Sequence, residues 1–294
     1  YAMRGSSVYQ QTLNLTISEK QKLRRLLEEN YLPKNRVYRY NFFYDNCTTR
    51  ARDIIEKCIE GKVVYSEGKE RLSFRDIVHQ YTKGHEWDEL GIDMCLGSEA
   101  DKPIDTRKQM FAPFYMLEAA KKATIVVGDS VRPLILHEKK VVDVEPEDVR
   151  EGFPLSPMVC VFILIGVTCF VGWLQFKIRK IIWIWDLLLF GVQGLAGCVI
   201  TFLVFFSTHP TVGSNWLILL LNPIPLIYLP VMVYRAIKGK KDYYHTINIV
   251  CLTSFMMIMP FIQQKFNVTV LPLALCLLIC SANHVLLYYR QNNK

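Results

Sequence analysis

The residue best suited to covalent chemistry is Cys47, which follows an aromatic-rich run and the pair Asp45-Asn46. Asp and Asn cap helices well, and apolar spacing through Ile54 and Ile55 follows, so the sequence predicts a helix that begins at Cys47. The positive end of a helix dipole favours a thiolate, and the unpaired N–H groups there can hold an oxyanion. The pattern therefore predicts a cysteine nucleophile that attacks a carbonyl group.

A structural role for Cys47 is the alternative, because free cysteine is among the residues most often buried. Helical spacing puts Cys47 on one face with Ala51, Ile54 and Cys58, so we expect the thiol at the edge of the core and not in open water. A Cys47–Cys58 disulfide is excluded, because the helix rises about 16 Å between these positions.

A thiolate nucleophile needs a base, usually a histidine. The first half of the chain offers His79, His85 and His137, each of which also fits an ordinary surface position. We expect the base to precede residue 1, since the chain begins without a signal peptide although its first half is predicted to be exported. The cysteines of the first half lack Cys-x-x-Cys spacing, so neither a metal site nor a cofactor is predicted.

The composition divides the chain into two halves. Of 35 Lys+Arg and 27 Asp+Glu in 294 residues, residues 157–294 hold only 10 basic and 2 acidic residues. Residues 1–156 are therefore neutral, which argues against a nucleic-acid-binding surface. The second half consists of apolar runs of about 20 residues, the length that crosses a bilayer.

These apolar runs predict an all-α transmembrane domain of five helices over residues 157–294. The predicted spans are Pro157–Phe176, Ile182–Phe206, Trp216–Tyr234, Thr246–Gln263 and Val268–Tyr289. Basic residues follow the first, third and fifth spans, whereas the other joints hold only Lys265 and His209. By the positive-inside rule the C-terminus is cytoplasmic and residues 1–156 lie on the outer side.

Polar residues are rare in the predicted membrane domain and are therefore informative. His209, Asn215 and the pair Asn222-Pro223 gather around the joint between the second and third spans. They predict either a structural turn or a polar lip that meets a lipid headgroup or the soluble domain. Asp186 and His284 are expected to lie at the membrane interface, near the ends of their spans.

Local signals in residues 1–144 predict a mixed α and β domain. Two capping boxes, Thr16 with Glu19 and Ser73 with Asp76, each predict a helix start. The predicted elements are a strand around Leu13–Ile17, a helix to Tyr31, a strand over Val37–Tyr44, the Cys47 helix, a short helix after Ser73, a helix over Pro113–Lys122 and a hairpin within Ile125–Val144. An acidic, Pro-containing tether over residues 145–156 should lead to the membrane.

Several of these segments resemble one bacterial family. The run Asn41-Phe-Phe-Tyr-Asp-Asn-Cys-Thr-Thr-Arg50, with Gly91–Asp101 and Gln109-Met-Phe111 downstream, resembles the Lnb-type lipoprotein N-acyltransferases, as does the segment from Thr208 to Pro223. The resemblance implies a permuted papain-like, NlpC-like α+β domain in which Cys47 is the nucleophile, and Asn46 and Asp45 match the motif as positioning residues. The family's Gly-His-Ser-type segment has no match here, so the outer domain is expected to be incomplete and this chain alone inactive.

The resemblance also implies the reaction and the partners. Cys47 would take an acyl chain from a phospholipid as a thioester and pass it to the α-amine of a lipoprotein's N-terminal cysteine. The protein is then expected in the bacterial inner membrane, with residues 1–156 in the periplasm and His209 and Asn215 as substrate-binding residues. A membrane-tethered cysteine peptidase or amidase that acts on cell-wall peptides remains an alternative, as does a non-enzymatic binding module on a membrane anchor.

Overall fold

The computed structural model describes residues 1–66, 68, 71–144 and 153–292. The chain forms two compact units, which we describe separately. The first comprises Tyr1–Val78 and Pro103–Glu151, and the second comprises His79–Lys102 and Gly152–Lys294. Residues 79–102 therefore pack with the second unit, whereas the sequence analysis assigns them to the outer domain.

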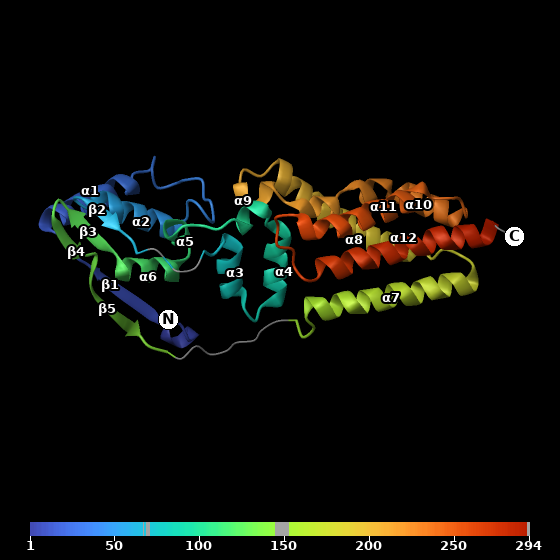
Figure 1. Cartoon of the computed structure of the whole chain (residues 1–294), viewed down its shortest axis with the longest axis horizontal. Coiled ribbons are helices and arrows are strands. Elements are labelled where there is room, and N and C mark those ends of the chain that lie inside the picture. Colours follow the sequence, from blue (N-terminus) through green and yellow to red (C-terminus); the bar gives the residue numbers. More distant parts are fainter. Residues whose placement is uncertain (67, 69–70, 145–152, 293–294) are drawn as a thin grey trace. The chain divides into compact units, whose positions relative to one another are not determined.

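The first unit combines helices with two antiparallel sheets (Figure 1). Its elements are η1 (Ala2–Arg4), β1 (Val8–Leu13), α1 (Ile17–Tyr31), α2 (Cys47–Cys58), β2 (Lys62–Val64), α5 (Thr106–Gln109), α6 (Pro113–Lys122), β3 (Thr124–Val127), β4 (Ser130–Pro133) and β5 (Ile135–Val142). Strand β1 pairs with β5 from Val8↔Val142 to Leu13↔Ile135, and β3 lies between β2 and β4. Helix α3 (Phe74–Thr82) contains the point where the chain first passes into the second unit.

Local capping explains where several helices begin. Thr16 and Glu19 form the predicted capping box of α1, and the helix ends at Tyr31 as expected. Ser73 and Asp76 exchange the corresponding hydrogen bonds at the start of α3. Helix α6 has the predicted bounds, and the predicted hairpin is β3 and β4 joined by Gly128-Asp129, with Gly128 at a φ of 57°.

The core of the first unit lies where α2, α6 and the β2–β3–β4 sheet meet. Cys58, Ala123 and Ile125 are fully or almost fully buried there. Glu19 is also buried, and its carboxylate accepts two 2.6 Å hydrogen bonds from Arg132 of β4. The N-terminus of α1 is thus joined to the sheet by a buried ion pair, with no unpaired charge.

Two predicted strands are wrong. Val37–Tyr44 contains no strand, because the side chain of Asn41 accepts the backbone N–H groups of Phe43 and Tyr44 and closes a turn. This local bond competes with an extended backbone. The strand expected around Leu13–Ile17 lies earlier in the chain and ends at Leu13. It does not continue to Ile17, because Thr16 is the N-cap of α1 and the helix begins at Ile17.

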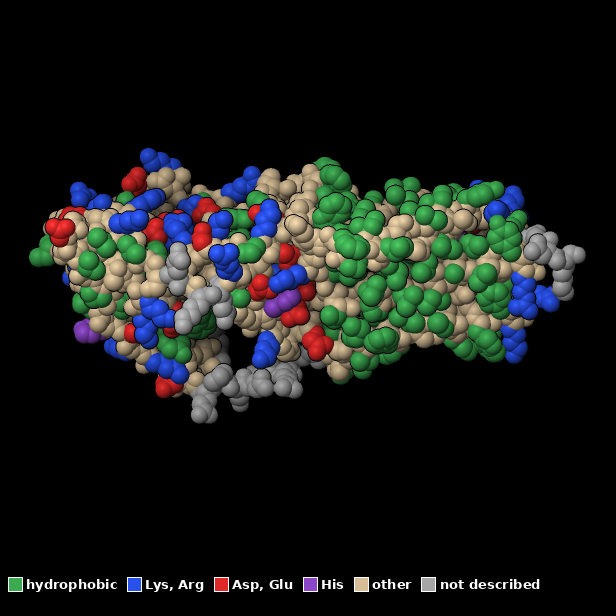
Figure 2. Space-filling view, viewed as in Figure 1, with side chains coloured by type: hydrophobic (Ala, Val, Ile, Leu, Met, Phe, Trp, Pro, Cys, Tyr) green, Lys and Arg blue, Asp and Glu red, His purple; other side chains and the backbone are tan. Residues whose placement is uncertain are grey.

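The second unit contains helices long and apolar enough to cross a membrane. In the described part of the chain there are five candidate spans: Pro157–Ile178 (helix α7), Trp183–Phe205 (α8), Pro210–Ile237, Tyr243–Phe261 and Val270–Gln291. On the face drawn in Figure 2, hydrophobic side chains cover most of the surface of the long helices. The remaining elements are α4 (Glu86–Cys95), η2 (Ser98–Asp101), α9 (Pro210–Gly213), η3 (Trp216–Leu219), α10 (Ile224–Ile237), α11 (Tyr243–Ile258), η4 (Met259–Phe261) and α12 (Val270–Asn292). Most of the predicted 145–156 tether lies outside the described residues.

The predicted third span is not one continuous helix. It consists of η3 and α10, which are separated by Leu220–Pro223. The Asn222 side chain accepts the backbone N–H of Ile224, and Pro223 is the N-cap of α10. A proline has no N–H to continue the helical hydrogen bonds, so the chain restarts its helix there.

Helix α8 packs closely on α10 because two of its residues are glycines. A Cβ atom at Gly194 would overlap Leu226, and one at Gly197 would overlap the backbone of Asn222. Small residues let membrane helices approach each other in this way. These glycines therefore set the distance between the two helices.

Asp186 and His284, expected to be interfacial, pair with each other inside the helix bundle. Asp186 is fully buried, and its carboxylate lies 2.7 Å from Nε2 of His284 and accepts from the Cys280 thiol. The His284 ring stacks on His245 with centroids 3.8 Å apart. The buried Asp186 carboxylate thus has two partners, Cys280 and His284, both on helix α12.

Candidate active site at Cys47

Helix α2 begins at Cys47, as predicted, because Asn46 caps it. The Thr49 N–H donates to Oδ1 of Asn46 at 2.9 Å, and the Asn46 N–H donates to Oγ1 of Thr49 at 2.8 Å. The side chain of Asn46 is a further donor to the carbonyls of Phe42 and Phe111. All polar groups of this buried asparagine are thus engaged, which fixes the residue before Cys47.

The Cys47 thiol is exposed, and its polar neighbour is Oγ1 of Thr48 at 4.0 Å. Among the described residues, no protein acceptor binds the backbone N–H groups of Cys47 and Thr48. These N–H groups lie at the positive end of a twelve-residue helix. They can therefore donate to an oxyanion that forms beside the sulfur.

The expected position of Cys47 at the edge of the core is wrong. The buried residues of α2 are Thr49, Arg52 and Cys58, so the inward face is turned away from Cys47 and Ala51. The cause is tertiary: Arg52 is 4% exposed and donates to the carbonyl of Arg107. A buried arginine on the inner face could not be foreseen from apolar spacing.

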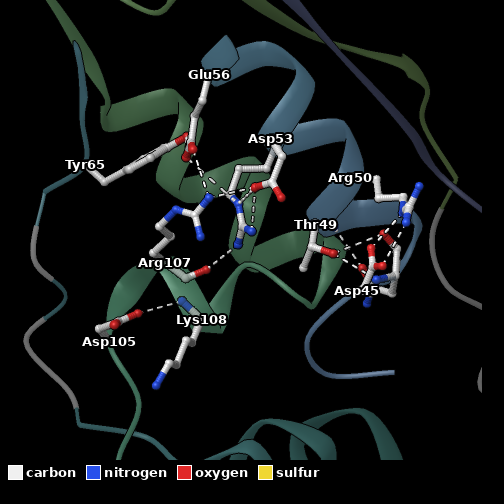
Figure 3. Close-up of polar contacts among 11 residues, drawn as sticks. Asp45, Thr49, Arg50, Asp53, Glu56, Tyr65, Asp105, Arg107 and Lys108 are labelled. Atoms are coloured by element: carbon white, nitrogen blue, oxygen red, sulfur yellow. Dashed lines mark hydrogen bonds and ion pairs between the residues drawn. The ribbon is translucent and has the colours of Figure 1, made fainter. Parts of the chain in front are cut away.

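A network of charged side chains fixes the orientation of α2 against α5 (Figure 3). Arg107 lies 2.7 Å from Asp53 and 2.9 Å from Glu56, and Arg52 also binds Asp53 at 2.7 Å. The Tyr65 hydroxyl donates to Glu56, and burial together with this carboxylate raises the pKa of Tyr65. The charged side chains on this face of α2 are thus paired with one another and not with Cys47.

The loop before Cys47 rests on an aromatic cluster. Phe43, Phe74 and Phe111 are almost completely buried, with ring centroids 4.6 to 5.3 Å apart. Contacts between aromatic edges and faces stabilise such a cluster beyond its buried area. The motif residue Phe43 and the downstream Phe111 thus meet beneath the loop that presents Cys47.

Asp45 is directed to Arg50. The two side chains form a bidentate ion pair at 2.7 and 2.8 Å (Figure 3), and the Arg50 guanidinium stacks 3.4 Å from the centre of the Tyr38 ring. Asp45 therefore holds the loop and does not contact the sulfur.

Tyr40 is a neighbour of Cys47 that sequence reasoning missed. Burial raises the pKa of its phenol, and the nearby Cys47 and Tyr38 raise it further. The position of Tyr40 inside a predicted strand gave no signal for this proximity.

The candidate bases have other partners. His79 Nε2 lies 2.8 Å from Asp93, and His85 Nδ1 lies 4.0 Å from Asp88. His137, on β5, faces Thr12 across the sheet. In the described part of the first unit, no histidine lies within hydrogen-bonding distance of Cys47.

His79, Glu89 and Asp93 are the described residues that could hold a metal ion. Each offers one ligand atom, and these atoms lie within 4.8 Å of one another. In the structure they form hydrogen bonds instead: Asp93 binds His79 and accepts from Asn267, and Glu89 accepts from Thr82. Sequence analysis missed the group because its members come from two helices.

The two predicted substrate-binding residues lie in different surroundings. His209 is partly exposed and lies at the N-cap position of the short helix α9, where its side chain forms no capping hydrogen bond. Asn215 is 3% exposed; its amide donates to the carbonyl of Met94, and Oδ1 accepts from Leu217 and Gln264. Asn215 thus joins α4 to the loops of the second unit, and its role in substrate binding stays a prediction.

Together these features describe a multi-pass membrane protein with an exposed cysteine at a capped helix start. Two family models match the chain: the Lnb N-terminal periplasmic domain over residues 1–83 and the Lnb transmembrane domain over residues 148–292. The chain belongs to the Lnb family, and it has a periplasmic segment and a multi-pass transmembrane domain. No curated protein and no solved structure matches it.

Proposed function

We propose that this protein is a lipoprotein N-acyltransferase that carries the acyl chain on Cys47. The observation that carries the proposal is the exposed thiol at the first position of α2, beside two backbone N–H groups that have no acceptor in the described structure. Membership of the Lnb family supports the same assignment. The C-terminus is then cytoplasmic, as the basic joints indicate.

The first half-reaction forms a thioester. The Cys47 thiolate attacks the ester carbonyl of a membrane phospholipid, and the N–H groups of Cys47 and Thr48 stabilise the oxyanion. The bond from the acyl carbon to the glycerol oxygen breaks, and the lysophospholipid leaves after its oxygen takes the proton that a base had removed from the Cys47 thiol. Asn46 and Asp45 act as positioning residues, since they hold the loop and the helix start.

The second half-reaction transfers the acyl group to nitrogen. The free α-amine of the lipoprotein's N-terminal cysteine attacks the thioester, a C–N bond forms and the C–S bond breaks. The amine proton leaves to a base, and the Cys47 thiolate is regenerated. Both substrates are anchored in one leaflet, so a membrane-held site replaces a three-dimensional search with local encounter.

Mass spectrometry of the Cys47 peptide tests the proposal on the protein purified from its native membrane. With phospholipid added and acceptor withheld, we expect a fatty-acyl mass on Cys47 that neutral hydroxylamine removes. Cys58 in the same helix is the internal control, because it is buried and should stay unmodified. Replacement Cys47→Ala should abolish N-acylation while the protein stays folded and inserted.

An isotopically labelled acyl chain identifies the donor. We expect label supplied in phospholipid to appear first on Cys47 and then in the lipoprotein amide. An acyl group on Cys47 that carries no label would still support the thioester. It would indicate that the acyl chain comes from an ester of the lipoprotein itself and not from the added phospholipid. An unmodified Cys47 under these conditions, together with cleavage of cell-wall peptides, would support the peptidase alternative.

A further inference from the structure

A basic hollow lies at one end of the helix bundle in the second unit. The last turn of α10, the loop before α11 and the last turns of α12 surround it. Its lining residues include Arg235, Lys240, Lys241, His284, Tyr288 and Tyr289, and it is a shallow hollow with an enclosed volume of about 30 Å³. In Figure 2, Lys and Arg side chains gather at this end, beyond the hydrophobic surface.

Hydrogen bonds and aromatic rings hold two of the cations in place. Arg235 donates to the backbone carbonyl of Lys241 at 3.0 Å, which folds the loop back on α10. The Lys241 ammonium lies 3.4 Å from the Tyr289 hydroxyl and about 5 Å from the centres of the Tyr243 and Tyr289 rings. An ammonium has three donors, so Lys241 keeps donors for a ligand.

Arg235, Lys240 and Lys241 line this hollow together with one carboxylate, so its positive charge is only partly offset by the protein. In the described part of the chain, none of Arg235, Lys240 and Lys241 forms an ion pair with a carboxylate. Asp242 is the acidic lining residue, and its Oδ1 accepts from the Tyr228 hydroxyl and the Tyr244 N–H. The His284 ring at the hollow is already paired with Asp186.

The position of the hollow at the helix ends indicates which anion can reach it. The hollow lies where α10 and α12 end and α11 begins, beside Tyr234 and Tyr243. Tyrosines at helix ends mark the headgroup level of a bilayer. Basic pockets between membrane helices at this level bind the phosphate groups of anionic lipids.

We infer that this hollow binds the headgroup of an anionic phospholipid, whose phosphate pairs with Arg235, Lys240 and Lys241. The site is separate from the acyl donor site at Cys47 and retains a lipid without acylating the protein. Which leaflet supplies the lipid follows from the proposed orientation, in which this end is cytoplasmic, but the binding itself does not depend on it.

Lipid binding to the purified full chain in nanodiscs tests the inference. Binding of phosphatidylglycerol is compared between wild type and the double variant Lys240→Gln/Lys241→Gln. Two lysines near a membrane surface contribute about 1 kcal/mol each, so the affinity should fall roughly 30-fold. The matched control is Lys177→Gln/Lys238→Gln, which removes the same charge at residues that do not line the hollow.

Three results would overturn the inference. An equal loss in both double variants would show only general attraction to a charged surface. Equal affinity for phosphatidylcholine and phosphatidylglycerol would remove the selectivity for net anionic lipid. Competition by millimolar inorganic phosphate would indicate a soluble anion and not a lipid. Unchanged thermal unfolding of the variant in detergent is required, so that lost binding is not lost folding.

Discussion

The side-chain amide of Asn46 donates a 2.8 Å hydrogen bond to the backbone carbonyl of Phe111, 65 residues further along the chain. The same side chain caps α2 through the N–H of Thr49. Asn46 therefore fixes both the start of α2 and the backbone of Phe111, a member of the aromatic cluster. Asn46 thus holds in place the backbone that presents Cys47.

Replacing Asn46 with Ala should loosen α2. The lost cap costs about 1 kcal/mol, and the carbonyl of Phe111 left unpaired costs about 1 to 3 kcal/mol. Amide hydrogen exchange in Thr48–Cys58 should then accelerate at least tenfold in the full-length protein. Asn35→Ala is the control, because its amide binds the Glu29 carbonyl at an exposed site. Unchanged exchange in Asn46→Ala would contradict the support role.

The two cysteines of α2 should differ strongly in reactivity. Cys58 is fully buried, and burial raises the pKa of its thiol, with the Glu19 charge as a further cause. Cys47 is exposed. Iodoacetamide at pH 7.5 should alkylate Cys47 first and Cys58 only after unfolding, as peptide mass spectrometry can measure. Early labelling of Cys58 would contradict the packing of α2.

The ion pair of Glu19 and Arg132 should make stability depend on pH. Burial alone would raise the Glu19 pKa, but the N–H groups of Thr16 and Glu60 and the Arg132 guanidinium lower it overall. A lowered folded pKa contributes stability above the unfolded value of about 4.3, and this stability is lost as the pH falls through the folded pKa.

Urea unfolding of the intact protein in detergent measures this contribution. At pH 7, Glu19→Gln should destabilise the protein by about 2 kcal/mol, the value of a charge-assisted hydrogen bond. The difference from wild type should shrink below pH 4. The control Glu28→Gln breaks an exposed pair with Arg24 and should cost about 0.5 kcal/mol or less. A difference that is constant with pH would contradict the ion pair.

Gly197→Ala should separate α8 from α10. The added Cβ would overlap the backbone of Asn222, which cannot move as a flexible side chain can. Such overpacking costs about 1 to 3 kcal/mol, so the unfolding temperature in detergent should fall. Gly166→Ala on α7 is the control, since its Cβ would have no neighbour within 4 Å. Equal effects of both variants would refute the close packing.

Much of the fold could be predicted where short-range chemistry decides it. The capping box of Thr16 and Glu19 and the cap of α2 by Asn46 involve residues three apart, so the printed sequence contains both partners. The apolar runs predicted the candidate spans for the same reason, because length and composition are local properties.

Two of the misses depend on partners far away in sequence. The inner face of α2 follows from Arg52, whose acceptor is the carbonyl of Arg107. Asp186 is buried because His284 arrives from another helix. A third miss is local: Val37–Tyr44 has the composition of a strand, but no described strand pairs with it, and the Asn41 turn forms instead.

The division of the chain into units has a consequence for proteolysis. The backbone passes between the two units at Val78-His79, at Lys102-Pro103 and again ahead of Phe153. A protease that cuts only in the stretch 145–152 would separate the first unit covalently from helices α7–α12, but residues 79–102, which pack with the second unit, would stay covalently joined to the first. Freeing the first unit from residues 79–102 would require two further cuts, at Val78-His79 and at Lys102-Pro103, and these would divide it into two pieces.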